Sequence, residues 1–191
     1  MDTPIVQLQS LSDSIRVCSL CRLCENRTNA VPGTGPYSAE IVFIGEGPGK
    51  REDETGIPFC GASGRLLDKM LTSIELSRDD VFITNIVKCR PPGNRDPLTD
   101  EKEICTTTYL DKQLELIAPK LIVTLGRHAL NHFLPDLKIS EVHGQPKRHN
   151  NRVYLSLYHP AAALYNGSML ATLQEDFQII PKLLRKLNAS T

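Results

Sequence analysis

Four short apolar runs, rich in β-branched residues, punctuate the chain. They span residues 41–44, 81–87, 121–125 and 153–157, and turn-forming residues flank each of them. Runs of this length are too short for a typical helix and are typical of strands that are buried on both faces. We therefore predict a strand at each of these positions.

Helical patterns lie before, between and after the predicted strands. The clearest is residues 63–74, where five apolar residues fall on one stripe of a helix. The other predicted helices cover residues 6–17, 99–117 with Thr99 as N-cap, 127–133 and 169–187. Strands that alternate with helices predict an α/β fold, with a mostly parallel sheet covered by helices on both faces.

The carboxyl ends of the predicted strands carry the candidate chemistry. The first strand runs into a glycine-rich turn, residues 45–49, the second contains Asn85, and the fourth leads to His159. Ligands of open parallel sheets bind beyond the carboxyl ends of the strands, so these three features are predicted to meet in one crevice. The turn lacks the spacing of a nucleotide-binding motif. We interpret its glycines as exposed backbone that can approach a flat ligand closely.

The composition excludes several classes of protein but selects none. With 191 residues, 40% hydrophobic and 23% charged, the chain is expected to fold as one domain over residues 1–191. Basic and acidic residues number 22 each, although basic residues cluster at Lys88, Arg90 and Arg95 and again at 147–152. No run approaches the ~20 apolar residues of a membrane span, and no secretion signal is visible, so we expect a cytoplasmic protein without a membrane partner.

Six cysteines in a reducing compartment favour a metal or catalytic role over disulfides. Three of them form the run Cys18-x-x-Cys21-x-x-Cys24, and Cys89 and Cys105 lie far downstream. The spacing leaves three interpretations open, namely a ferredoxin-like cluster on the first three cysteines, a zinc ion on four cysteines, or a redox pair.

Several motifs, taken together and in order, resemble one family. They are Phe43-Ile44-Gly45-Glu46-Gly47-Pro48-Gly49, Gly56-Ile57-Pro58-Phe59, Thr84-Asn85-Ile86-Val87-Lys88-Cys89-Arg90-Pro91-Pro92 and His159-Pro160-Ala161-Ala162. With Cys18-x-x-Cys21-Arg22-Leu23 and Cys105, they are similar to the type 4 (family 4) uracil-DNA glycosylases. The match runs from about Cys18 to the C-terminal helix, and no single motif would be specific by itself.

The resemblance implies a fold and a cofactor. The implied fold is a three-layer α/β/α sandwich on a four-stranded parallel sheet. Enzymes of this family carry a [4Fe–4S] cluster on four cysteines, and by position the ligands here are Cys18, Cys21, Cys89 and Cys105. The cluster-binding segment then covers about residues 1–30, and the cluster braces the protein rather than transferring electrons. Cys24 is an extra cysteine that lies near enough to compete as a ligand.

The resemblance also implies a reaction, the hydrolysis of the N-glycosidic bond of uracil in single- or double-stranded DNA during base excision repair. By position, the uracil-binding residues are Glu46, Gly47, Pro48, Glu52, Phe59, Asn85 and His159. Phe59 is expected to stack on the flipped base, Asn85 to read its N3–H and O4, and Glu52 to exclude thymine. His159 is expected to donate to uracil O2 as charge develops there, and Glu46 stands where family 1 enzymes place a water-positioning aspartate.

The expected partner is uracil-containing DNA, and we expect a monomer that can associate with a polymerase clamp. Three alternatives remain open at this stage. An iron–sulfur electron carrier would need neither Asn85 nor His159. A non-catalytic nucleic-acid-binding protein would keep the pocket only for binding, and a zinc-stabilised relative would lack the cluster.

Overall fold

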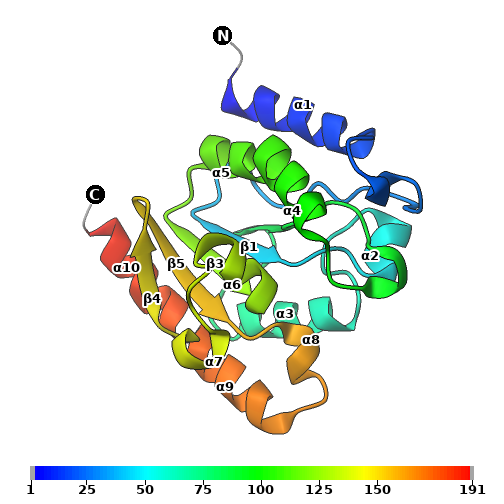
Figure 1. Ribbon diagram of the computed structural model, residues 1–191. Coiled ribbons are helices and arrows are strands. Elements are labelled where there is room, and N and C mark those ends of the chain that lie inside the picture. The colour runs from blue at the N-terminus through cyan, green and yellow to red at the C-terminus, as the bar shows by residue number, and fades with distance from the viewer. Residues whose placement is uncertain (1–2, 190–191) are drawn as a thin grey trace.

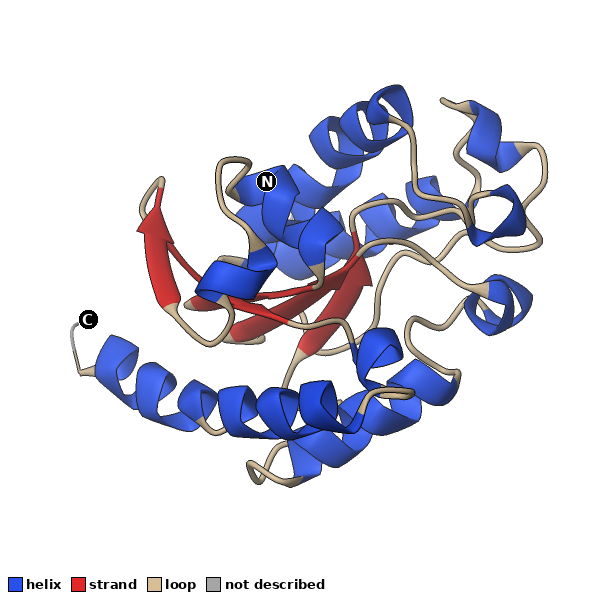
Figure 2. Ribbon diagram, turned by 60° about the horizontal axis from the view of Figure 1, so that its bottom comes forward, coloured by secondary structure: helices blue, strands red, loops and turns tan. Residues whose placement is uncertain are grey.

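One sheet forms the centre of the molecule, and helices cover both of its faces (Figures 1 and 2). The computed structural model describes residues 3–189, and within them the sheet has five strands in the order β2-β1-β3-β5-β4. The strands are β1 (Ile41–Gly45), β2 (Phe82–Asn85), β3 (Leu121–Leu125), β4 (Pro146–His149) and β5 (Arg152–Leu157). β1 pairs in parallel with β2 and β3, and β3 pairs in parallel with β5. The four predicted strands and their parallel arrangement are confirmed.

The additional strand β4 corrects the predicted four-stranded sheet. It pairs antiparallel with β5 through a turn at Asn150 and Asn151, whose φ angles are 46° and 59°. Positive φ at both central residues is typical of the type I′ turn of a tight hairpin. β4 reads Pro-Lys-Arg-His and is largely exposed at the sheet edge. It therefore lacks the apolar run on which the other strands were predicted.

Five helices cover one face of the sheet. They are α1 (Pro4–Arg16), α4 (Thr99–Cys105), α5 (Asp111–Ile117), α6 (Arg127–Phe133) and α7 (Ile139–Val142). The predicted helix 99–117 is interrupted, because residues Thr106–Leu110 form a π turn directly after Cys105. Its N-cap is Leu98 rather than Thr99, and the Leu98 N–H donates to the Glu101 carboxylate at 2.8 Å. π turns are frequent at functional sites.

The opposite face is covered by α3 (Ala62–Thr72), α8 (Pro160–Ala163), α9 (Gly167–Phe177) and α10 (Ile179–Asn188). The predicted helix 169–187 is therefore divided at Gln178. Pro181 has no N–H to donate to the carbonyl of Phe177, and its ring crowds that carbonyl, which explains the division. The remaining short helices are α2 (Lys50–Thr55), η1 (Arg22–Cys24) and η2 (Pro92–Asn94).

The sheet separates two hydrophobic cores. All residues of β1, β2 and β3 are buried, as expected for strands covered on both faces. Val42 and Ile44 pack toward α1 and α5, whereas Phe43 packs toward α9, where its ring stacks on Phe177 with centroids 5.9 Å apart. The three-layer α/β/α architecture is confirmed. The carboxyl ends of the parallel strands share one edge, and the candidate site lies there.

Candidate active site

A cleft of about 720 Å³ opens at the carboxyl ends of the parallel strands. The predicted crevice is therefore present. The cleft is lined by all of the residues that the sequence placed around uracil, namely Glu46, Gly47, Pro48, Glu52, Phe59, Asn85 and His159. These residues come from four segments that are far apart in sequence, and only the strand order brings them together.

Phe59 occupies a tightly constrained turn on one wall of the cleft. It is buried and has a φ of 51°, which a bulky residue rarely adopts. Arg78 holds this turn, because its guanidinium donates to the carbonyl oxygens of Pro58, at 2.9 Å, and of Phe59. Gly64 packs against the same turn, and a Cβ at Gly64 would lie 1.5 Å from the Phe59 carbonyl oxygen. The ring of Phe59 is thus fixed before any ligand binds.

Asn85 is the last residue of β2 and is only 2% exposed. Its Oδ1 is buried and has no hydrogen-bond partner within residues 3–189. Gly45 lies directly beside it, and a Cβ at Gly45 would approach Oδ1 to 2.4 Å and the Phe59 ring to 2.7 Å. A buried acceptor without a donor costs about 1–3 kcal/mol, so the site is suited to a ligand that brings an N–H group.

Glu52 projects from α2 toward the turn that precedes α3. Its Oε1 accepts a hydrogen bond from the Gly61 N–H at 3.2 Å. Gly49 lies close on the other side, where a Cβ would come within 2.8 Å of Glu52 Oε2. The carboxylate is therefore held at the wall of the cleft between two glycines.

His159 is the N-cap of α8, and its Nδ1 accepts a hydrogen bond from the Ala161 N–H at 3.1 Å. The neutral ring must then carry its proton on Nε2. Burial and the nearby His128 lower the pKa of His159 to about 4. At neutral pH the ring is therefore an uncharged donor. It also stacks on the Phe59 ring, with centroids 5.6 Å apart.

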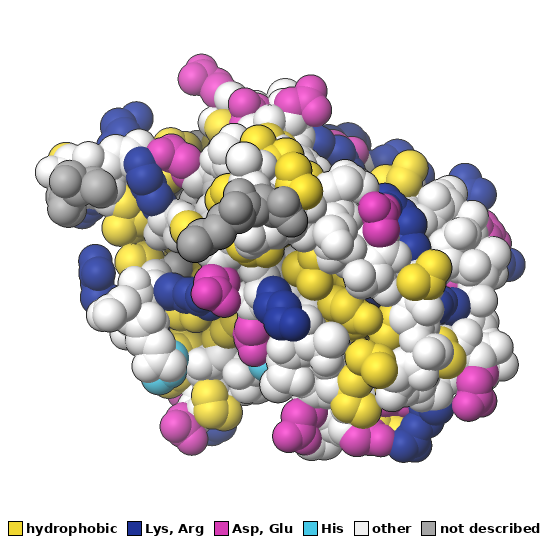
Figure 3. All heavy atoms as spheres, turned by 90° about the horizontal axis from the view of Figure 1, so that it is seen from above, with side chains coloured by type: hydrophobic (Ala, Val, Ile, Leu, Met, Phe, Trp, Pro, Cys, Tyr) yellow, Lys and Arg dark blue, Asp and Glu magenta, His cyan; other side chains and the backbone are white. Residues whose placement is uncertain are grey.

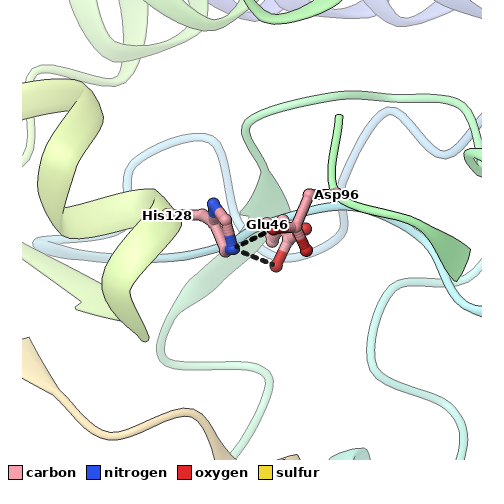
Figure 4. A group of neighbouring side chains, drawn as sticks. All are labelled: Glu46, Asp96 and His128. Carbon is pink, nitrogen blue, oxygen red and sulfur yellow. Dashed lines mark ion pairs between the residues drawn. The ribbon is translucent and has the colours of Figure 1, made fainter. Parts of the chain in front are cut away.

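Glu46 lies with Asp96 and His128 at one side of the cleft (Figure 4). His128 Nε2 lies 3.7 Å from Glu46 Oε2 and 3.3 Å from Asp96 Oδ2. Burial raises the pKa of Glu46, His128 opposes that increase, and Asp96 adds to it. Sequence reasoning missed both neighbours. His128 follows the predicted strand end at Gly126 and could have been found, whereas Asp96 lies in a loop without a distinguishing pattern.

The cysteines gather at a second site, on the α1 side of the sheet. A small cavity there is lined by five of the six cysteines, Cys18, Cys21, Cys24, Cys89 and Cys105. Positive and N–H groups face the sulfurs, because Arg27 Nη1 donates to Cys89 Sγ at 3.1 Å and the Lys88 N–H to Cys105 Sγ at 3.3 Å. Cys60 lies elsewhere, with its Sγ 3.2 Å from the Thr55 hydroxyl.

The chemistry of this sulfur set fits a metal centre that binds thiolates. All six thiols are free, and burial raises the pKa of Cys105 to about 11, so a cation is needed to hold thiolates there. Iron–sulfur clusters and zinc both take ligands of this kind.

The two clusters of basic residues noted in the sequence do not form one DNA-facing surface at the cleft. Lys88 is 1% exposed, and its Nζ donates to the Thr84 hydroxyl at 2.7 Å and the Asn85 carbonyl at 2.9 Å, so it supports the strand end rather than facing DNA. The second cluster, 147–152, lies on the β4–β5 hairpin, whose turn is at the opposite end of the sheet from the cleft. Figure 3 shows acidic and basic side chains intermingled on the face seen from above.

The chain was matched by one family model and by several characterised proteins. The model, described as the uracil DNA glycosylase superfamily, covers residues 32–185. The chain is 46% identical to the type-4 uracil-DNA glycosylase of Sulfurisphaera tokodaii over 186 residues. The aligned region covers 92% of this chain and 84% of that protein. The type-4 enzyme of Archaeoglobus fulgidus is 47% identical over 191 residues, 94% of this chain and 96% of that protein. A type-5 uracil-DNA glycosylase of Pyrobaculum aerophilum is 34% identical over 159 residues, which cover 73% of this chain and 69% of that protein.

Proposed function

The chain belongs to the uracil-DNA glycosylase superfamily and, within it, to the type-4 enzymes. We propose that its cleft holds an extrahelical uracil while the bond between uracil and deoxyribose is hydrolysed. The protein is a DNA repair hydrolase that acts on uracil-containing DNA. The observation that supports the roles given below is the convergence of Phe59, Asn85, Glu46 and His159 on one cleft. No described helix is long and apolar enough to cross a membrane.

The base is proposed to leave the duplex and stack on Phe59. Flipping costs a few kcal/mol, and stacking returns about 1–3 kcal/mol without regard to base identity. The fixed turn at Phe59, held by Arg78, supports this role because no side-chain ordering is needed when the base enters.

Asn85 and Glu52 are proposed to select uracil. The unpaired Oδ1 of Asn85 would accept from uracil N3–H, and its amide nitrogen would donate to O4. Cytosine presents an acceptor and a donor at these positions, so the same amide orientation rejects it. The Glu52 side chain, fixed by the Gly61 N–H, would occupy the space that the 5-methyl group of thymine needs.

His159 is proposed to stabilise the leaving base. Negative charge grows on uracil O2 as the glycosidic bond breaks, and the Nε2–H of neutral His159 would donate to it, together with the backbone N–H groups of Glu46 and Gly47. A preorganised donor of this kind contributes about 10²–10³ in rate. The low pKa matters because it leaves Nδ1 unprotonated at pH 7, so that Nδ1 can accept from the Ala161 N–H while Nε2 carries the proton that is donated.

Glu46 is proposed to orient and deprotonate the water that attacks the sugar. Its carboxylate lines the cleft, and burial raises its pKa toward the range in which a carboxylate is a useful base. The reaction adds water across the bond, so uracil leaves with a proton and an abasic site remains.

The cysteine site is proposed to hold a [4Fe–4S] cluster on Cys18, Cys21, Cys89 and Cys105. The chemistry that it supplies is structural, since hydrolysis transfers no electrons. It would fasten the segment 1–30, described from residue 3 onward, to the loop after β2. That segment contains Thr28, whose N–H donates to the buried Asp53 carboxylate of α2 at 2.9 Å, next to Glu52. The cluster would thus brace two walls of the cleft.

Several coarser properties are proposed with the activity. The chain is expected to form one domain over residues 1–191 and to work as a monomer in the cytoplasm, where six free thiols remain reduced. Association with a polymerase clamp is also expected. The electron-carrier and binding-only alternatives explain the cysteines or the cleft separately, but not why Cys89 follows Asn85 so closely in one chain.

A single-stranded oligonucleotide that bears one uracil tests the proposal. The wild-type protein should convert it to an alkali-labile abasic product, and Asn85→Ala and His159→Ala should each be at least about 100-fold slower. Full activity in both variants would overturn the assigned roles. Iron and sulfide analysis tests the cofactor, and zinc without sulfide would refute the cluster.

A further inference from the structure

Glu46, Asp96 and His128 come from three separate segments and meet at one atom, His128 Nε2 (Figure 4). Glu46 follows β1, Asp96 follows η2, and His128 is the second residue of α6, which follows β3. Their ligand atoms all lie within 4.8 Å of one another. This group sits on the wall of the cleft, because all three residues line it.

Two carboxylates this close together repel each other unless a positive group lies between them. Asp96 raises the pKa of Glu46, in the same direction as burial. His128 lowers the pKa of Glu46 more than any other neighbouring charge does, and Arg127 and Lys102 lower it less. Without the imidazole, Glu46 would therefore be harder to ionise, and only the ionised carboxylate can take a proton from water.

Arg127 lies against both the imidazole and the Asp96 carboxylate. Arg127 Nε lies 3.0 Å from His128 Nε2, and Arg127 Nη2 lies 3.3 Å from Asp96 Oδ2. A neutral imidazole accepts the Arg127 hydrogen bond at Nε2, whereas a protonated imidazole donates from the same atom to the carboxylates. The titratable and charged groups near His128 are Glu46, Asp96, Arg127 and His159, and Lys102 acts on Glu46.

A divalent metal ion is a weaker explanation for the same convergence. The Arg127 guanidinium already lies against His128 Nε2 and Asp96 Oδ2, where an ion would have to approach. A fixed guanidinium beside an ion of the same sign would oppose binding of that ion. The positive charge that the two carboxylates require is supplied by the side chains themselves.

We propose that His128 is a positioning residue that holds the Glu46 carboxylate in place and keeps it ionised for attack on the sugar. This inference rests on the proposed role of Glu46 as the base. His128 also lies near His159 and lowers its pKa. One imidazole thus favours both required states, an ionised Glu46 and a neutral His159.

The rate of base release in single turnover, measured against pH, tests this role. His128→Gln places a neutral amide donor near the position of Nε2, and His128→Ala removes the donor as well. Both should move the acidic limb of the profile upward by about one pH unit, since a charge within ~4–6 Å shifts a carboxyl pKa by 1–3 units and this group is partly exposed. The plateau rate at high pH should be unchanged in His128→Gln and about tenfold lower in His128→Ala.

Two further variants make the test specific. Asp96→Asn removes the repulsion on Glu46, so its acidic limb should move downward, opposite to the His128 variants. His132→Gln makes the same change one turn later on α6, where the His132 ring packs edge-on against Phe133, and its profile should match the wild type. Unchanged limbs in both His128 variants would overturn the proposal, as would a shift in His132→Gln of the same size.

A measurement independent of activity separates the two proposals. In protein labelled with ¹³C at the glutamate carboxyl carbons, the titration of Glu46 should move to higher pH in His128→Gln. If Glu46→Gln keeps full activity, the role of Glu46 as base fails even if this coupling is observed. If Glu46→Gln is slow but the carboxyl titration is unmoved, the role of His128 fails. Loss of activity on adding a chelator, with restoration by Mn²⁺ or Zn²⁺ that requires Asp96 and His128, would show that a metal holds Glu46 instead.

Discussion

Replacing Arg78 should weaken substrate binding although Arg78 lies outside the cleft lining. Its guanidinium donates to the carbonyls of Pro58 and Phe59, and its Nε pairs with Asp68 Oδ1 at 2.6 Å. The side chain is 29% exposed, so each contact is partly screened. Hydrogen bonds to charged groups contribute about 1.5–3 kcal/mol each when buried, and the discounted loss in Arg78→Met is about 2–4 kcal/mol of unfolding free energy.

The same substitution should reach the chemistry through Phe59. A bulky residue at positive φ costs about 1–3 kcal/mol and persists only when its surroundings enforce it. If Arg78→Met releases even about 1.4 kcal/mol of that constraint, the population of the stacking conformation falls about tenfold. KM for a uracil oligonucleotide should then rise about tenfold, while kcat changes little, because Phe59 acts on binding rather than on bond cleavage.

Steady-state kinetics and thermal unfolding of Arg78→Met check both effects. For a chain of this size, the lost stability corresponds to a Tm that is lower by about 4–16 °C. Arg65→Met is the matched control, since Arg65 is exposed on α3, the helix that also carries Asp68, and the substitution removes the same charge. Wild-type KM and Tm in Arg78→Met would refute the reasoning and would mean that the close contact with Gly64 suffices to fix the turn.

Three further outcomes are expected. Because the pKa of His159 falls from 6.5 to about 4 on folding, the unfolded chain binds a proton first, so stability should decline as pH falls from about 6.5 toward 4; His159→Gln should reduce that decline in unfolding curves recorded at several pH values. Gly64→Ala, whose Cβ would lie 1.5 Å from the Phe59 carbonyl oxygen, should lose at least about 3 kcal/mol in denaturant unfolding, whereas Gly167→Ala, with open space around it, should not. Cys24→Ser should keep iron and sulfide by elemental analysis and Cys89→Ser should lose them; the opposite result would assign the ligand to Cys24.

The amino-acid sequence by itself determined the layered α/β architecture and the edge at which the site lies. Short apolar runs can satisfy their backbone only as buried strands, and parallel strands place their carboxyl ends together. Asn85 and His159 were therefore predictable, since each stands at a strand end. The edge strand β4 was not, because an exposed strand of Pro, Lys, Arg and His needs no apolar pattern.

Tertiary structure alone decided which groups act on which. Lys88 reads as a surface cation in the sequence, yet it is buried against the Asn85 carbonyl, since a local pattern does not reveal which loop covers it. The contacts of Arg78 with the Phe59 turn and of His128 with Glu46 join segments separated by 19 and about 80 residues. Such pairings depend on where loops cross at the strand ends, and their energies come from burial and charge separation, which exist only once the chain has folded.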